Sequence, residues 1–215
     1  MQTAGLSTLF SPIHWTFFHA VLQFNTLIAY LKPKMSQNRF SIEARAYDIA
    51  GLAAHDFWVL RDEKDNVLGQ LHGLATNPKN EILPIGKIGD KLKFYHFGSR
   101  AILLGLNPDY DLNYIKADQK SKLVFAGTSD DILDRWDNAV KALPYLNSLE
   151  VPYTPFAIIG LTHINSNTAY TLLGKLMAIP VYKFSGYWQP GWRNTNKILT
   201  SSQLKSMRYF NAIII

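Results

Sequence analysis

Two strand patterns joined by a short polar turn restrict the folds open to this chain. Residues 50–60 carry bulky side chains on both faces of the strand pattern, which indicates a strand covered on both sides. Residues 62–66 are wholly polar, as in the turn of a β-hairpin, and residues 67–72 form the returning strand. The sequence therefore predicts a buried hairpin with one histidine on each strand, His55 and His72.

A polar run at Asn165-Ser166-Asn167-Thr168 is the second informative segment. Apolar residues at helical spacing follow it and share one face: Ala169, Leu172, Leu173 and Leu176. Oxygen-bearing side chains accept backbone N–H groups at helix starts, so the run predicts a capped helix. Ser166 thereby becomes a hydroxyl at the positively polarised end of a helix, where developing negative charge is favoured.

Further elements follow from the same kinds of pattern. Apolar spacing predicts a helix that begins at Ser129 or Asp130 and that Pro144 stops. Alternation and short apolar runs favour strands at 39–48, 91–97, 155–160 and 181–184.

Two segments between these elements are interpreted differently. Residues 74–128 are rich in Gly, Asn, Asp and Pro and indicate an insertion that decorates the core. Residues 186–192 form an aromatic, glycine-rich loop that contains Trp188. The whole predicts an α+β fold, in which a small, mostly antiparallel sheet packs against the helix that starts at Asn165.

Composition agrees with a globular domain. Of 215 residues, 47% are hydrophobic and 18% are charged, which excludes a disordered chain and allows one domain with a real core. The chain contains no cysteine, which excludes disulfides, thiolate metal sites and a thiol nucleophile. No metal-ligand spacing recurs among the histidines, so we expect no metal and no cofactor.

The net charge of +6 is unevenly distributed. Residues 1–150 balance to zero, whereas residues 151–215 hold six basic residues and no acidic one. This excess favours an anionic partner such as a lipid surface or an acidic wall polymer. Because the six charges are widely spaced, scattered surface charge is the alternative, and a nucleic-acid partner is disfavoured.

The N-terminal segment is apolar and uncharged up to Lys32. Residues 9–31 are long enough to span a bilayer, but polar residues interrupt them, and no positive charge precedes them as in a secretory signal. A membrane-associated segment, a buried helix and a poorly folded extension all stay open. We predict an N-terminal extension over 1–34, a domain over 35–200 and a basic, apolar tail over 201–215, with a secreted, periplasmic or membrane-associated location favoured.

The order of His55, His72 and the Asn165-Ser166 motif resembles that of the circularly permuted papain-like proteins. This group includes lecithin:retinol acyltransferase-like enzymes and permuted NlpC-type hydrolases. There a first histidine lies on a strand, a second polar residue, often histidine, lies on the next strand, and the nucleophile follows much later in an Asn-Cys motif that caps a helix. Ser166 stands where the family has cysteine.

The resemblance implies a permuted papain-like fold and a hydrolase or acyltransferase acting on an amide, peptide or ester bond. Ser166 would be the nucleophile, His55 the general base and His72 the group that orients it. Asn165, Asn167 and Trp188 would form the oxyanion and substrate contacts. Peptides, peptidoglycan and lipids are the implied substrates.

The replacement of cysteine by serine leaves alternatives open. A thiol ionises beside an imidazolium, whereas a serine hydroxyl must lose its proton to a base during attack. The chain could therefore be a catalytically inactive binding module of the same fold, or a secreted toxin or effector domain. Ser166 could also serve as a helix cap alone, both histidines as core residues, and the Trp188 loop as an aromatic lid. His163, three residues before Ser166, is a further candidate for the same cleft.

Overall fold

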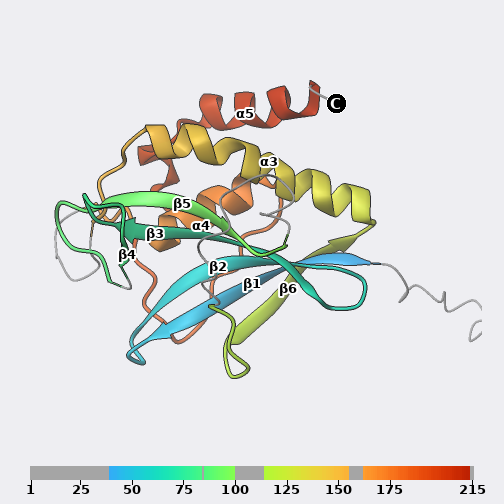
Figure 1. The fold of residues 1–215 in the computed structure, drawn as a ribbon, viewed down its shortest axis with the longest axis horizontal. Coiled ribbons are helices and arrows are strands. Elements are labelled where there is room, and N and C mark those ends of the chain that lie inside the picture. The colour runs from blue at the N-terminus through green and yellow to red at the C-terminus, as the bar shows by residue number, and fades with distance from the viewer. Residues whose placement is uncertain (1–38, 84, 100–113, 155–161, 214–215) are drawn as a thin grey trace, which may run out of the picture. The chain divides into compact units, whose positions relative to one another are not determined.

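The computed structural model describes residues 39–83, 85–99, 114–154 and 162–213, with the side chains of 209–213 excepted. These residues form an α+β domain with one six-stranded antiparallel sheet, as the sequence predicts (Figure 1). The predicted N-terminal extension at 1–34 and the predicted strand at 155–160 lie outside the described residues. Among the described helices, none is long and apolar enough to cross a membrane.

The sheet has the strand order β4-β3-β2-β1-β6, and β5 pairs with β3. Its strands are β1 (Phe40–Ile49), β2 (Ala53–Arg61), β3 (Val67–Thr76), β4 (Ile82–Leu83), β5 (Lys91–Phe97) and β6 (Lys120–Gly127). The predicted hairpin is confirmed as β2 and β3, and the predicted strands at 39–48 and 91–97 correspond to β1 and β5.

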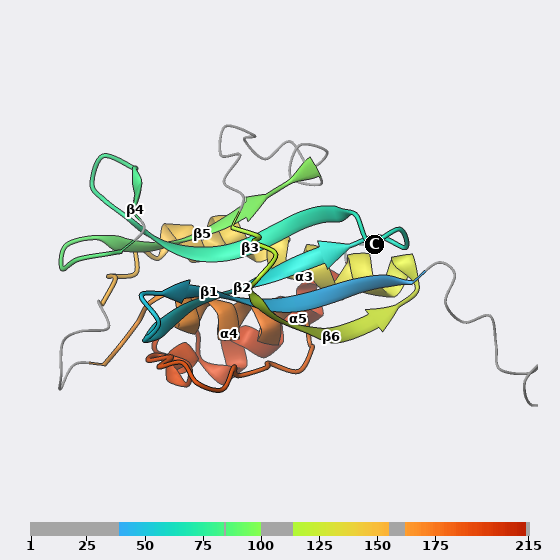
Figure 2. The same cartoon turned by 90° about the horizontal axis from the view of Figure 1, so that it is seen from below.

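The helices lie on one side of this sheet. They are α3 (Ser129–Ser148), α4 (Ser166–Leu176) and α5 (Ser201–Ile213), with a 3-10 turn η1 (Asn194–Lys197) between the last two. Helix α4 contacts β2 and β3, α3 contacts β1, β5 and β6, and α5 contacts the other two helices. Figure 1 shows α3 and α4 above the sheet and α5 beyond them, and Figure 2 gives the view from the strand side.

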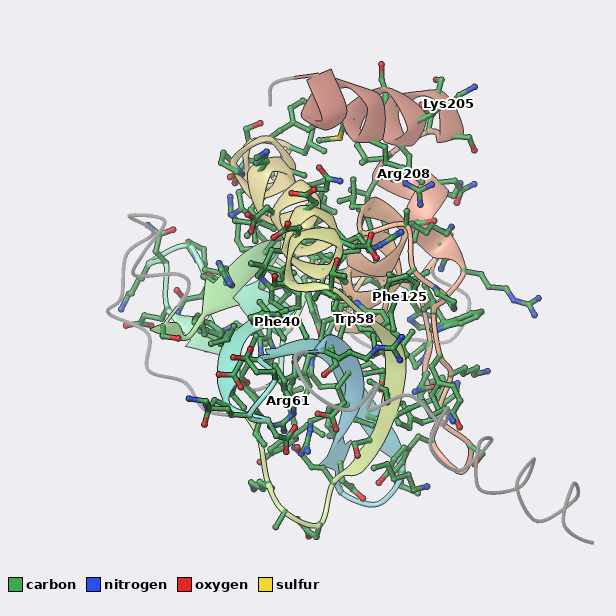
Figure 3. The ribbon with its side chains drawn as sticks, turned by 90° about the vertical axis from the view of Figure 1, so that its right-hand side faces the viewer. Phe40, Trp58, Arg61, Phe125, Lys205 and Arg208 are labelled. Carbon is green, nitrogen blue, oxygen red and sulfur yellow. The ribbon has the colours of Figure 1, made fainter. Side chains whose placement is uncertain are left out.

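The core lies between the sheet and helices α3 and α4. Trp58 of β2 is fully buried, its ring stacks on that of Tyr170 in α4 at 4.4 Å, and its Nε1–H donates to the Tyr170 carbonyl at 2.8 Å (Figure 3). Gly73 of β3 allows α4 to approach the sheet, since a Cβ there would lie 2.0 Å from the Cβ of Ala169. This close approach holds the start of α4 against the histidine-bearing strands.

Several expectations differ from the structure. Helix α3 continues through Pro144 to Ser148, because Leu146 beyond the proline is fully buried in the core. Residues 181–184 form no strand; Tyr182 instead accepts a hydrogen bond from the Tyr170 hydroxyl through its carbonyl.

The two predicted peripheral segments also contain regular structure. Strands β4, β5 and β6 all lie within residues 74–128, so this range contributes to the sheet rather than only decorating it. Residues 201–213 of the predicted tail form α5. Composition did not reveal β6, because its pairing with β1 depends on a contact distant in sequence.

Candidate functional site

Strands β2 and β3 diverge at the point where the two histidines lie. The two strands are paired between Trp58–Arg61 and the first half of β3, up to Leu71. Beyond this point β2 continues along β1, whereas β3 continues along β5 and reaches β4. His55 and His72 therefore face each other across the opening between the strands.

Both histidines point to the face of the sheet opposite the helices. On β2, His55 and Phe57 alternate with Trp58, which packs toward α4, so their side chains lie on the other face. There the rings of Phe57 and His72 stack at 4.6 Å, and Tyr114 lies 4.7 Å from His72. Both imidazoles are buried, with 6% and 1% exposure, so neither is a surface histidine.

We assign the tautomers of the two imidazoles from their hydrogen bonds, with the Gln70 amide oriented so that its Oε1 faces His72. His72 Nε2 lies 3.3 Å from Oε1 of Gln70, an oxygen that can only accept, so His72 carries its proton on Nε2. A neutral His72 then accepts at Nδ1, which lies 2.9 Å from His55 Nε2. His55 must donate there, which leaves a lone pair on its Nδ1. The structure thus brings into contact the two histidines that the sequence predicts on neighbouring strands.

Both rings are neutral at physiological pH. Burial lowers the pKa of His55 to about 4. Burial also holds the pKa of His72 well below its ordinary value, and repulsion from His55 and His96 adds to this. A neutral imidazole is the form that can accept a proton, although a low pKa reduces the driving force for the transfer.

A cavity of about 330 Å³ joins His55 to Ser166. We call it the histidine cavity; its wall includes three tyrosines, Tyr47, Tyr114 and Tyr153, and the aliphatic residues Ile49, Leu74, Leu83 and Ile85. Asp48 is the one charged residue among the described residues of this lining, and its carboxylate accepts a hydrogen bond from the Tyr187 hydroxyl. The volume lies at the lower end of the range for small-molecule sites.

Ser166 is the first residue of α4 and not its cap. The cap is Asn165, whose side chain accepts the Asn167 N–H at 3.1 Å, while the Thr168 hydroxyl accepts the Asn165 N–H at 3.2 Å. The capping alternative for Ser166 is therefore wrong. Its hydroxyl instead interacts with the Tyr153 phenol. Among the described residues, no hydrogen bond joins Ser166 to His55, although both line the histidine cavity.

Asn167 ties the start of α4 to the strand that carries His55. Its Oδ1 accepts the backbone N–H of Asp56 at 3.2 Å. Because Asp56 follows His55 and Asn167 follows Ser166, this bond fixes the two candidate catalytic residues relative to each other. Asn165 and Asn167 line a smaller hollow together with Ser166 and Tyr153. Their amides carry these structural bonds, and neither lines the histidine cavity.

Tyr153 is a site residue that sequence patterns missed. Its backbone N–H donates to the Asp90 carbonyl at 2.9 Å, and its ring packs so closely on Gly86 that a Cβ there would lie 2.5 Å away. Burial raises the pKa of Tyr153 to about 12, against the effect of the Ser166 hydrogen bond, so the phenol stays protonated. No periodicity marks this residue, because contacts distant in sequence bring it to Ser166.

Asp56 is a second missed residue, on the helix side of β2. It is fully buried, and its Oδ2 accepts a hydrogen bond from Gln189 Nε2 at 2.6 Å. Burial raises the pKa of Asp56 to about 8, although Gln189 and the charge of Lys183 oppose the shift. The carboxyl is therefore protonated at neutral pH and anchors the Trp188 loop to β2.

The other candidates among the described residues do not line the histidine cavity. Trp188 is 51% exposed, and its ring lies 6.1 Å from that of His163. Neither belongs to the cavity lining. His96 accepts the Trp136 Nε1–H at 3.1 Å in the core. His14 and His19 lie outside the described residues. Within the described part of the chain, no three His, Asp or Glu side chains cluster as metal ligands do.

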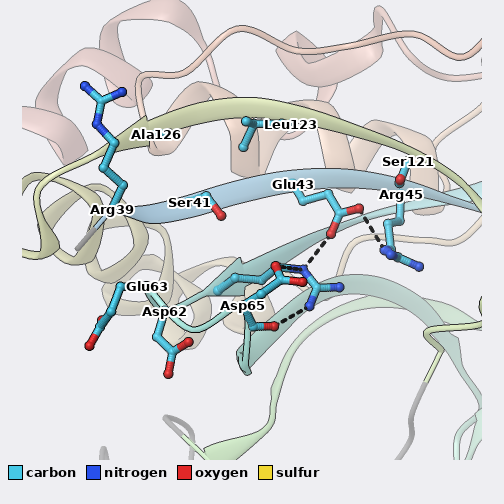
Figure 4. A pocket seen from close by; sticks show the side chains of 11 residues that line it. Arg39, Ser41, Glu43, Arg45, Asp62, Glu63, Asp65, Ser121, Leu123 and Ala126 are labelled. Atoms are coloured by element: carbon cyan, nitrogen blue, oxygen red, sulfur yellow. Dashed lines mark hydrogen bonds and ion pairs between the residues drawn. The ribbon is translucent and has the colours of Figure 1, made fainter. Parts of the chain in front are cut away.

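A larger hollow of about 530 Å³ lies on the outer face of β1, β2 and β6, and we call it the arginine groove (Figure 4). At its centre the buried Glu43 accepts hydrogen bonds from Arg61 at 2.9 Å and Arg45 at 3.1 Å. The charged lining residues are Arg39, Glu43, Arg45, Arg61, Asp62, Glu63 and Asp65. Two of its three arginines, Arg45 and Arg61, thus already donate to a carboxylate within the protein.

Comparison with protein-family models, curated proteins and solved structures finds no match to this chain.

Proposed function

We propose that the protein is a serine-dependent hydrolase or acyltransferase that acts on an amide, peptide or ester carbonyl in the histidine cavity. The observation that carries the proposal is the hydrogen-bond order from Gln70 through His72 to His55. This order leaves Nδ1 of a neutral His55 as a proton acceptor, and His55 and Ser166 line the same cavity. The Ser166 hydroxyl does not cap its helix, because the N-cap is Asn165.

In the proposed reaction, Ser166 Oγ attacks the substrate carbonyl while its proton moves to His55 Nδ1. The imidazolium that forms continues to donate its Nε2–H to Nδ1 of His72. His72 continues to donate its own Nε2–H to Oε1 of Gln70. The Tyr153 phenol, which interacts with Ser166 and stays protonated because burial raises its pKa to about 12, would donate to the carbonyl oxygen as negative charge develops. As the carbonyl carbon's bond to the leaving group breaks, His55 returns the proton to that group and an acyl-Ser166 ester is left. Water or an acyl acceptor then attacks this ester with His55 as base, and Ser166 Oγ leaves with the proton.

The fold proposal is a permuted papain-like arrangement. Support comes from the order of elements: the strand with His55, the next strand with His72, and the helix that begins with Ser166. Helix α4 packs on both of these strands, and Gly73 allows its close approach. In this arrangement the nucleophile and the base come from distant parts of the chain and meet at one opening of the sheet.

A catalytically inactive binding module is the second candidate, and the low pKa of His55 favours it. A base of pKa about 4 has little power to deprotonate a serine hydroxyl, and Ser166 interacts with Tyr153 rather than with His55. In that case the histidine cavity would hold an uncharged, partly apolar ligand without turning it over.

Hydrolysis assays separate these candidates. We expect the wild-type chain to hydrolyse p-nitrophenyl butyrate or an N-acetylated peptide amide with a burst of acyl-enzyme, and Ser166→Ala to reduce turnover to background. Ser166→Cys is the matched variant, since a thiol requires less help from His55. Activity in Ser166→Cys together with an inert wild type would identify the inactive module. No activity in either would reject the hydrolase proposal for these bonds.

A further inference from the structure

Three large apolar side chains stand exposed beside the histidine cavity. Leu52 is 76% exposed, Ile85 58% and Trp188 51%. The Trp188 N–H donates to the Leu52 carbonyl at 2.9 Å, and Ile85 lines the smaller hollow together with Ala53 and Pro190, which are close to Leu52 and Trp188 in the chain. We call these three side chains the rim. Exposed apolar side chains that gather around a cavity indicate a contact surface more often than scattered ones do.

The interior behind this rim is also apolar. Ile49 and Ile85 line both hollows, and Leu74 and Leu83 continue the aliphatic wall. Asp48 is the one charged residue in the described lining of the histidine cavity. An acyl chain could therefore pass from an apolar phase beyond the rim to Ser166 without meeting a charged side chain that lacks a partner.

Basic residues near the Trp188 loop indicate that the partner of the rim is anionic. The loop that carries Trp188 is flanked in the chain by Lys183 and Arg193, both exposed. Residues 151–215 contain six basic residues and no acidic one. Asp56 beneath the loop is protonated, because burial raises its pKa to about 8. Apolar side chains beside cations match the interface of a bilayer with anionic head groups.

We propose that the rim of Leu52, Ile85 and Trp188 docks on an anionic lipid surface, from which a lipid acyl ester enters the histidine cavity. The choice of an acyl ester rests on the proposed function, whereas docking on lipid does not require turnover.

A single introduced cysteine reports docking at the rim itself. Because the chain has no cysteine, Leu52→Cys in the full chain can be labelled with an environment-sensitive fluorophore at one site. Leu123→Cys is the matched control, since Leu123 is also an exposed leucine, at 60%, but lies in the arginine groove. Both are made in the Ser166→Ala background and titrated with vesicles of phosphatidylcholine, with and without phosphatidylglycerol.

We expect the label at position 52 to shift to shorter wavelength with the anionic vesicles, and the label at 123 to stay unchanged. Equal shifts at both positions, or none at 52 while the chain sediments with vesicles, would overturn the proposal. A shift at 52 that depends on protein concentration without vesicles would instead identify a contact between two copies, and would also overturn it.

Turnover then links docking to substrate. Leu52→Ser is expected to leave hydrolysis of soluble p-nitrophenyl butyrate unchanged and to lower hydrolysis of a vesicle-borne acyl ester about tenfold, the ratio that the loss of one well-buried apolar contact produces. Equal loss on both substrates would reject the rim as a docking surface. Absence of hydrolysis on both, with the label at 52 still shifting, would reject the proposed function and leave docking standing.

Discussion

The outer face of the sheet carries two hollows that differ in how their polar groups are satisfied. In the arginine groove, Glu43 lies between Arg45 and Arg61, and Arg61 also lies 3.6 Å from Asp65. In the histidine cavity, His55 uses one ring nitrogen on His72 and has no other hydrogen-bond partner among the described residues. The central charges of the larger hollow are paired with one another, whereas in the smaller one His55 keeps a ring nitrogen without a hydrogen-bond partner among the described residues.

The volume of a hollow therefore does not indicate whether its polar groups are available to a ligand. The groove has about 530 Å³ and seven charged lining residues, but its central charges stabilise one another. The cavity has about 330 Å³ and neutral imidazoles, whose cost of burial is offset by hydrogen bonds, one for His55 and two for His72, and by ring stacking. A ligand gains more from the second arrangement, because no ion pair must first be broken.

The largest expected effect is the loss of the base. His55→Ala should lower kcat for ester hydrolysis about 10²–10⁴-fold, because Asp48, the other strong proton acceptor in the described cavity lining, already accepts hydrogen bonds from Tyr187 and Gly51. Steady-state kinetics measure it. His163→Ala is the control, since His163 lies beside Trp188 and outside the cavity lining, and it should retain activity. An unchanged kcat in His55→Ala would show that His55 is not the base, and that the histidine cavity does not differ from the arginine groove in this way.

The next effect concerns stability in the arginine groove. Glu43→Gln should lower the free energy of unfolding by about 2 kcal/mol, because two half-buried guanidinium groups lose their shared carboxylate. Urea unfolding followed by circular dichroism measures it, and Ser41→Ala in the same lining is the control. Turnover should be unchanged. A fall in kcat with the fold intact would make the groove part of the functional site.

Removal of the group behind the histidine pair should have a smaller effect. Gln70→Leu frees His72 Nε2, so His55 no longer has a single favoured tautomer, and kcat should fall up to about tenfold at unchanged KM, as for one hydrogen bond. Nitrogen chemical shifts of the imidazoles report the tautomer directly. A retained Nε2–H form of His55 in this variant would show that Gln70 does not set it.

The smallest effect is the response to pH between 6 and 8. Burial lowers the pKa of His55 to about 4, so the base is neutral throughout this range, and kcat/KM should be flat there and fall only as the pH drops through about 4. A midpoint near the ordinary histidine pKa would contradict the buried arrangement. Circular dichroism at each pH provides the control for folding.

Acid should affect the arginine groove by a different route. Burial raises the pKa of Glu43, but hydrogen bonds from Arg61 and Arg45 outweigh it, so the pKa is lowered overall. The stabilisation from this carboxylate is therefore complete above its unfolded pKa and is lost as the pH falls through the lowered value. Glu43→Gln should accordingly lose less stability than wild type on acidification.

Local patterns were sufficient to predict several elements of the site. The hairpin with His55 and His72 follows from two strand patterns around a polar turn, and α4 follows from its polar start and apolar face. Each of these two predictions rests on a periodicity over a few residues, which depends on neighbours along the chain. The same reasoning failed at Pro144, where burial of Leu146 outweighed the local tendency of proline to end a helix.

Sequence patterns thus fix the α+β class, the capped helix and the strand positions of both histidines, because these depend on neighbours along the chain. They do not fix the divergence of β2 from β3, the tautomer of His55, or the arrival of Tyr153 at Ser166. Those features arise from contacts between residues far apart in sequence. The close approach of Gly73 to α4 and the Asn167–Asp56 hydrogen bond then place the hydroxyl and the imidazole around one cavity.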